Sequence, residues 1–128
     1  MPQLVKGGKW IFGWVVVQPG IKIIIPPEAY REYGFQAGEE IVFTRGSRRS
    51  GGFGIGRADK LPPLLKKRVL AQGRMGRHGR VVLPPEVGVQ VGDRLLAGRG
   101  SGYALGFVAQ GPIYKEALKH PELEVFGG

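Results

Sequence analysis

The sequence contains no cysteine and only two histidines, His78 and His120. Without cysteine there is no disulfide scaffold, no thiolate nucleophile and no zinc site built on sulfur, and two histidines do not favour an all-histidine metal site. No grouping of serine, histidine and carboxylate indicates a catalytic triad. The glycine-rich segment Gly51–Gly56 lacks the lysine of a P-loop and does not fit the dinucleotide-binding pattern. We therefore expect a protein that is not an enzyme and uses no metal or other cofactor.

Long apolar runs are also missing. The most hydrophobic stretch, Trp10–Ile25, has 16 residues and is interrupted by Gln18, Pro19, Gly20 and Lys22. A membrane span needs about 20 apolar residues without such breaks. A signal peptide is conceivable here, but Gln18-Pro19-Gly20 makes a poor cleavage site. The sequence therefore predicts a cytoplasmic protein with no membrane partner.

Basic residues and turn-forming residues are abundant. Lysine and arginine number 19 against 10 acidic residues, which gives a net charge of +9 on 128 residues. Residues 57–80 alone carry eight basic side chains and one acidic side chain. The 23 glycines and 10 prolines indicate many turns, and hence short strands more than long helices. This composition favours one mainly β domain with an anionic partner, most often nucleic acid.

Three blocks of sequence occur twice in the same order. The pairs are Lys22–Glu28 with Arg80–Glu86, Gly34–Glu39 with Gly88–Asp93, and Arg45–Ser47 with Arg99–Ser101. The offset between copies falls from 58 to 54, because the second copy lacks four residues where the first has 29–33. An internal repeat of this kind indicates that one structural unit is used twice.

Each copy predicts the order strand, strand, short helix, strand, strand. A helix over Pro27–Tyr33 should stop at Gly34 and shrink to a turn in the second copy. The later strands are expected at Glu40–Arg45 and Gly52–Gly56, and at Arg94–Arg99 and Tyr103–Ala109, and a short helix at Pro112–His120. The chain then divides into repeat 1 (10–57), a basic linker (58–67), repeat 2 (68–109) and a C-terminal helical tail (110–128) within one compact domain, 1–128.

The second copy resembles a known family. Gly79-Arg80-Val81-Val82-Leu83-Pro84, then Gly88, then Val91–Leu95 is similar to the signature of the AbrB/MazE/SpoVT family of DNA-binding domains. The similarity covers residues 68–109 well and residues 10–57 more loosely. In that family two four-stranded units interlock as swapped hairpins in a closed barrel. The resemblance implies a mainly β, AbrB-like swapped-hairpin barrel with short helices, formed here as an intrachain pseudo-dimer.

The resemblance also implies where nucleic acid is contacted, namely at basic residues just before and within the Gly-Arg-Val step. These positions hold Arg74, Arg77, His78 and Arg80. Their counterparts in the first copy are Val16, Pro19, Gly20 and Lys22, so that only Lys22 keeps a charge. Two further arginines, Arg48 and Arg49, could compensate from the Ser47–Gly51 turn. The predicted function is a DNA-binding transcription regulator that contacts the duplex through these seven candidate residues, on one lopsided basic face.

One alternative function remains open at this stage. The chain could be a protein-interaction module, such as an antitoxin whose tail (111–128) docks a partner, although the tail could also pack on its own domain.

Trp10, Phe12 and Trp14 should share one face of a strand, as core or as a base-stacking platform. A homodimer or higher oligomer is also possible. Lys60, Lys66 and Lys67 are read as the solvated face of the linker.

Overall fold

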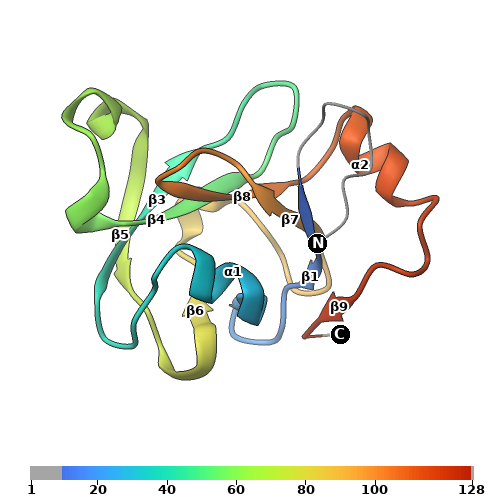
Figure 1. Cartoon of the computed structure of the whole chain (residues 1–128), viewed down its shortest axis with the longest axis horizontal. Helices are drawn as coiled ribbons and strands as arrows, with labels where there is room; N and C mark the ends of the chain where they lie inside the picture. Colours follow the sequence, from blue (N-terminus) through green and yellow to red (C-terminus); the bar gives the residue numbers. More distant parts are fainter. Residues whose placement is uncertain (1–9, 128) are drawn as a thin grey trace.

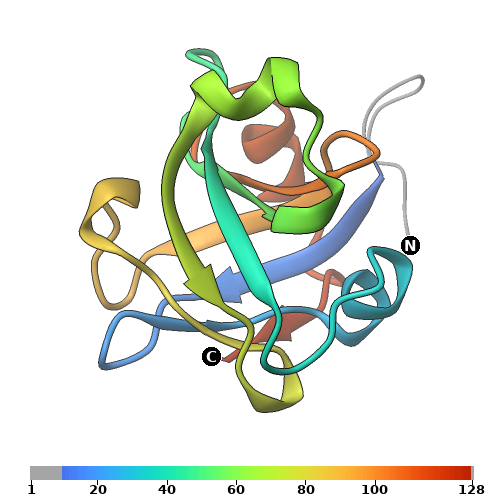
Figure 2. The same ribbon diagram turned by 90° about the vertical axis from the view of Figure 1, so that its left-hand side faces the viewer.

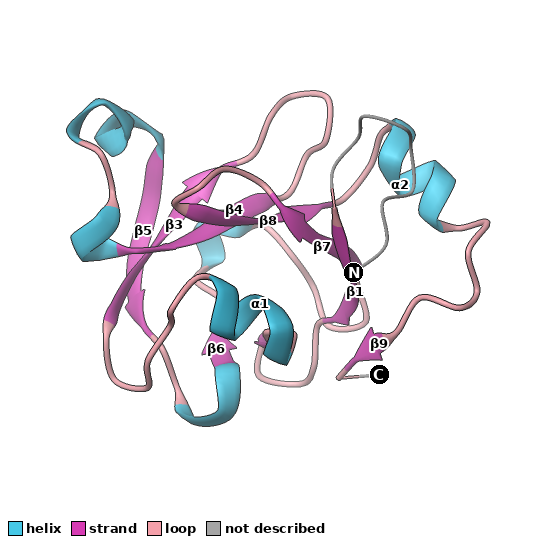
Figure 3. Ribbon diagram, viewed as in Figure 1, coloured by secondary structure: helices cyan, strands magenta, loops and turns pink. Residues whose placement is uncertain are grey.

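The computed structural model describes residues 10–127. Its strands are β1 (Ile11–Val16), β2 (Lys22–Ile24), β3 (Glu40–Arg45), β4 (Phe53–Arg57), β5 (Val69–Arg74), β6 (Arg80–Val82), β7 (Arg94–Arg99), β8 (Ala104–Val108) and β9 (Val125–Phe126). Two short α-helices, α1 (Pro27–Glu32) and α2 (Pro112–Ala117), and the 3-10 turns η1 (Ala58–Lys60), η2 (Pro63–Arg68), η3 (Arg77–Gly79) and η4 (Pro85–Val87) complete the described chain. Strands make up most of the regular structure, and the helical segments are short (Figure 3). The predicted mainly β class with short helices is confirmed.

Within residues 10–127, seven strands form one sheet in the order β5-β3-β4-β8-β7-β1-β9, and β2 pairs with β6 in a separate ribbon. All pairings are antiparallel except that of β1 with β9. The predicted closed barrel is not found in the described part of the chain, where β5 and β9 lie at the two ends of the sheet. Because β9 occupies the outer edge of β1, that edge is not free to pair with β5. Figure 1 shows β5 on the left and β1 with β9 on the right.

The two copies of the repeat occupy equivalent places in this topology. The first strand of each copy pairs with the third strand of the other, β1 with β7 and β5 with β3. Both pairings contain a register shift at the corresponding place, between Ile11 and Gly13 and between Val69 and Ala71. The two copies also meet directly where β4 pairs with β8 and β2 with β6. Their strands are therefore interleaved around an approximate twofold relation.

The turns into β2 and β6 adopt the same unusual backbone conformation. Gly20 and Ile21 have φ values of 86° and 55°, and the corresponding pair His78 and Gly79 have 57° and 75°. A left-handed conformation is uncommon for Ile21, because its branched side chain crowds the backbone. It persists here because the Ile21 carbonyl accepts a hydrogen bond from the Leu83 N–H at 2.8 Å. The equivalent bond joins Ile25 N–H to the Gly79 carbonyl at 2.9 Å.

The main core lies between the inner face of the sheet and the β2–β6 ribbon. Ile23 and Val81 point inward from the ribbon and are fully buried, and they belong to the same cluster as the rings of Phe53 and Phe107. These two rings stack with centroids 4.9 Å apart, and one comes from each copy of the repeat. A single core is therefore built from both halves, as expected for segments too short to bury a core alone.

The expectation that Phe12 and Trp14 share a face is wrong. Phe12 is the extra residue of the register shift in β1 and packs into the main core, whereas Trp14 belongs to a second cluster with Ile11 and Leu96. A β-bulge of this kind adds one residue and reverses the side-chain alternation beyond it. Trp10, just before the strand, is 40% exposed and joins neither cluster.

The C-terminal tail packs on its own sheet. The Tyr114 ring of α2 meets Trp14 edge-on with centroids 5.1 Å apart, and Ala117 and Leu123 are buried in the second cluster. The tail then adds β9 beside β1, where a Cβ at Gly13 would lie 2.6 Å from the Glu124 carbonyl oxygen. Glycine at position 13 is therefore what lets the tail approach this strand.

Candidate nucleic-acid interface

The β2–β6 ribbon presents a basic face to solvent. Ile23 and Val81 point into the core, so the alternation of a strand places Lys22 and Arg80 on the opposite, outer face. Both side chains are exposed. Lys22 pairs with Val82, and Arg80 with Ile24, so the two cations sit diagonally on the ribbon. They are also counterparts in the two copies of the repeat, which makes this the most symmetrical part of the candidate site.

The segment that enters the ribbon from β5 adds positive charge on one side only. Arg77 and His78 lie in η3, immediately before Arg80, and both are exposed. The left-handed conformation of His78 turns the chain sharply back toward β6. On the other side, the corresponding turn before Lys22 exposes Pro19 and Gly20, which carry no charge. Arg77 in this exposed turn is one of the eight basic residues of 57–80, and its counterpart in the first copy, Pro19, is uncharged.

Arg74 is more constrained than the other candidates. It ends β5 opposite Glu40 in the register, and its Nη1 donates a hydrogen bond to the Gly38 carbonyl at 3.0 Å. A guanidinium group has further donors, and the side chain is exposed, so it retains capacity for a phosphate. Its acidic partner in the register and its internal hydrogen bond make it a weaker candidate than Arg77 or Arg80.

Arg48 and Arg49 do not join this group. They lie in the turn between β3 and β4, which is at the top of Figures 1 and 2, whereas the segment between β5 and β6 is at the bottom of both views. The Gln110 side chain donates to the Arg48 carbonyl at 3.3 Å and ties this turn to the segment after β8. The structure therefore separates the seven candidates into five near the ribbon and two at the far end of the molecule.

The ribbon also contains exposed apolar side chains that the sequence reading did not single out. Val82 is 62% exposed, and Ile24 is half-buried on the same outer face. In the sequence, both residues lie one position from the buried Ile23 or Val81, and the alternation of a strand could have predicted that they face outward. Apolar groups between cations can contact base edges or the thymine methyl group, while the cations contact phosphates.

Other kinds of site have less support in the described residues. Across residues 10–127 no cluster of three or more histidine or acidic side chains is placed to hold a metal ion. No helix in that part of the chain is long and apolar enough to cross a membrane. Comparison of the chain with known protein families, with curated protein sequences and with solved structures finds no match.

Proposed function

We propose that this protein is a cytoplasmic DNA-binding transcription regulator that grips duplex DNA through the outer face of its β2–β6 ribbon and the turn before it. The observation that carries the proposal is that Lys22 and Arg80 share the outer face of the ribbon, while Arg77 and His78 are exposed in the turn immediately before β6. Arginine forks suit phosphates and the guanine edge, and lysine adds a mobile point charge.

The strand pairing supports the finer architecture that goes with this function. The exchange of first strands between the two halves, together with the β2–β6 and β4–β8 contacts, fits an AbrB-like swapped-hairpin unit formed as an intrachain pseudo-dimer. In that arrangement the ribbon lies across the approximate twofold axis. The basic turn, however, belongs to the second half alone, so the DNA contact is asymmetric.

The charge of the surface predicts how binding depends on salt. Each cation that neutralises a phosphate releases condensed counterions, so that the slope of log K against log salt changes by about 0.9 per contact. Arg77 and Arg80 are exposed, and no ion pair joins either one to a described acidic residue. Neither guanidinium group therefore has to give up an ion pair within the described chain when it contacts a phosphate of DNA.

The test compares two double variants that lose the same charge. Arg77→Ala with Arg80→Ala removes two cations from the proposed surface, and Lys66→Ala with Lys67→Ala removes two exposed cations from η2. Fluorescence anisotropy with labelled genomic duplex fragments at several salt concentrations should show the slope falling by about 2 for the first variant. The variant with Lys66→Ala and Lys67→Ala should keep a slope close to that of the wild type. Equal effects of the two double variants would mean that only bulk charge matters, and no duplex binding by the wild type would refute the function.

A further inference from the structure

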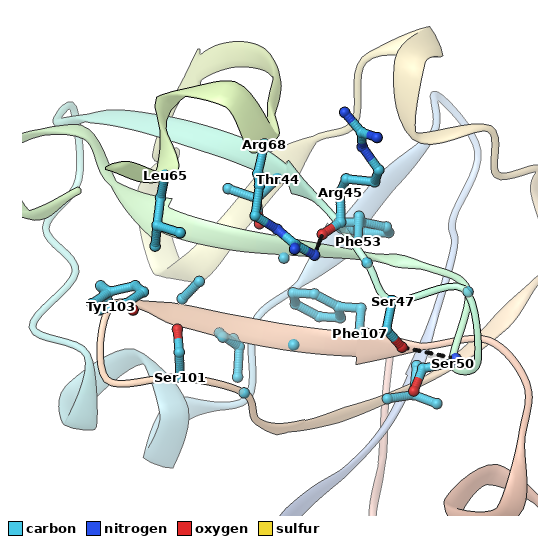
Figure 4. Close-up of a pocket in the computed structure, with 18 of the residues that line it drawn as sticks. Thr44, Arg45, Ser47, Ser50, Phe53, Leu65, Arg68, Ser101, Tyr103 and Phe107 are labelled. Carbon is cyan, nitrogen blue, oxygen red and sulfur yellow. Dashed lines mark hydrogen bonds between the residues drawn. The ribbon is translucent and has the colours of Figure 1, made fainter. Parts of the chain in front are cut away.

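A cavity of about 320 Å³ lies on the other face of the sheet from the ribbon. The strands β3, β4 and β8 form its base, the β3–β4 and β7–β8 turns form two sides, and Leu61, Leu65 and Arg68 of the linker form a third (Figure 4). Its size is within the usual range for a site that holds a small organic molecule.

The base of the cavity includes two glycines on neighbouring strands, which add no side chain to it. Gly54 and Gly106 face each other across β4 and β8, and both line the cavity. Gly106 has no unusual φ, and a Cβ there would come no nearer than 3.5 Å to another atom. Neither backbone conformation nor close packing therefore requires glycine at 106. The missing side chain leaves a flat surface on which a planar group can lie.

The polar groups that line the cavity are either positively charged or neutral. Arg68 extends over the strands and donates from Nη2 to the Arg45 carbonyl at 3.0 Å, which leaves its other donors free to meet a ligand. The Arg45 side chain points away from the cavity in Figure 4. Tyr103, Ser101 and Thr44 also line the space, and no carboxylate does so among the described residues. The net charge at the cavity is therefore positive and comes from one well-placed guanidinium.

We propose that this cavity binds a small planar carboxylate, with an aromatic ring on the glycine floor and the carboxylate on Arg68. Leu61 and Leu65 would cover the ring, because both line the cavity from the linker. A guanidinium–carboxylate pair is a strong, directional hydrogen-bonded contact, which sets the orientation of the ligand. The site goes beyond DNA binding and does not depend on it, since none of the five residues near the ribbon lines the cavity.

Isothermal titration calorimetry with 2-naphthoate and benzoate tests the site on the full chain. Benzamide removes the charge and cyclohexanecarboxylate removes the planarity, so each isolates one part of the proposed recognition. The wild type should bind the two aromatic acids saturably and more tightly than either comparison compound. The proposal fails if no aromatic acid binds, or if the neutral or non-planar compound binds equally well.

Two variants, each with a matched control, place the binding in the cavity. Arg68→Gln keeps an N–H donor for the Arg45 carbonyl but removes the charge, and Lys67→Gln makes the same charge change on an exposed neighbour that does not line the cavity. Gly106→Val fills the floor, and Gly102→Ala adds a methyl group in open space. Loss of the charged contact should weaken binding about 10-fold or more.

Thermal melting of all four variants separates folding from binding. If Gly106→Val melts well below the wild type, Gly106→Ala replaces it, because the added Cβ meets only ordinary contacts. Folded Arg68 and Gly106 variants that bind 2-naphthoate as tightly as their controls would overturn the proposal. Reduced binding in both, with unchanged binding in Lys67→Gln and Gly102→Ala, is the expected result.

Discussion

The stacked pair Phe53 and Phe107 offers a direct test of how the two halves share one core. The two residues lie opposite each other in β4 and β8, and their rings are only 2% and 1% exposed. Truncating a buried phenylalanine to alanine costs about 3–5 kcal/mol, while a domain of this kind has a total stability of about 5–15 kcal/mol. Phe53→Ala or Phe107→Ala should therefore remove a large share of the stability of the whole domain.

The pairing also predicts how the two substitutions combine. With centroids 4.9 Å apart and planes 18° from parallel, the rings form an offset stack. Such pairs contribute about 0.5–1.5 kcal/mol beyond their buried area, so the double variant should lose less than the sum of the singles by about that amount. If an alanine variant does not fold, Phe→Leu substitutions at the same two positions allow the same comparison of single and double variants with smaller losses of stability.

Urea denaturation measures both effects. Far-ultraviolet circular dichroism follows the sheet, and tryptophan fluorescence follows the first half, where Trp14 in β1 is 4% exposed and Trp10 lies just before the strand. If the halves share one core, a single substitution in either half shifts both signals together in one cooperative transition. A biphasic transition, or one probe that does not respond to Phe107→Ala, would refute the reasoning.

Three further predictions concern contacts outside this pair. The Arg99 guanidinium hydrogen-bonds Glu32 at 2.8 Å and lowers the pKa of that carboxyl, so the pair stabilises the fold above the carboxyl's ordinary pKa and loses this contribution as pH falls through the lowered value. Arg99→Gln should thus lower the melting temperature slightly at neutral pH and not in acid, where both proteins melt alike. Burial raises the pKa of Tyr33 to about 12, so ultraviolet titration should show one tyrosine ionising late, and Tyr33→Phe should remove it. Deleting residues 111–128 should lower the free energy of unfolding and shift tryptophan emission to longer wavelength, because the deletion uncovers Trp14; an unchanged stability and spectrum would contradict the packing of the tail.

Short-range signals made the local structure predictable. The strands Glu40–Arg45 and Arg94–Arg99 occur as expected, since each follows a Gly-Glu or Gly-Asp turn and ends at a glycine-rich turn. The helix after Ile25-Pro26 begins at Pro27 and ends near Gly34, whose φ of 70° is that of a glycine C-cap. In the second copy, η4 is the predicted shrunken helix.

Long-range features were not predictable from the sequence. The bulge that sends Phe12 inward depends on pairing with β7, which is far along the chain. The parallel contact of β9 with β1, which leaves the sheet open, involves only two residues and has no local signal. The predicted linker folds into η1 and η2, where proline and lysine gave no periodic pattern.

The candidate interface was partly predictable for the same reason. The repeat placed Lys22 and Arg80 at equivalent positions, and the ribbon brings them to one face. No local pattern, by contrast, could tell that the Arg48–Arg49 turn lies at the far end of the molecule from the ribbon. The cavity beside Arg68 was also missed, because its lining comes from three segments that are far apart in the sequence.

The central claim is that DNA lies on the ribbon and on the turn before it. Hydrogen–deuterium exchange of the full chain, with and without a saturating duplex at low salt, tests this claim segment by segment. The account predicts slower exchange in residues 74–82 and 20–24, and no change in residues 45–52 or 60–68. Protection confined to the β3–β4 turn or to the linker would contradict it.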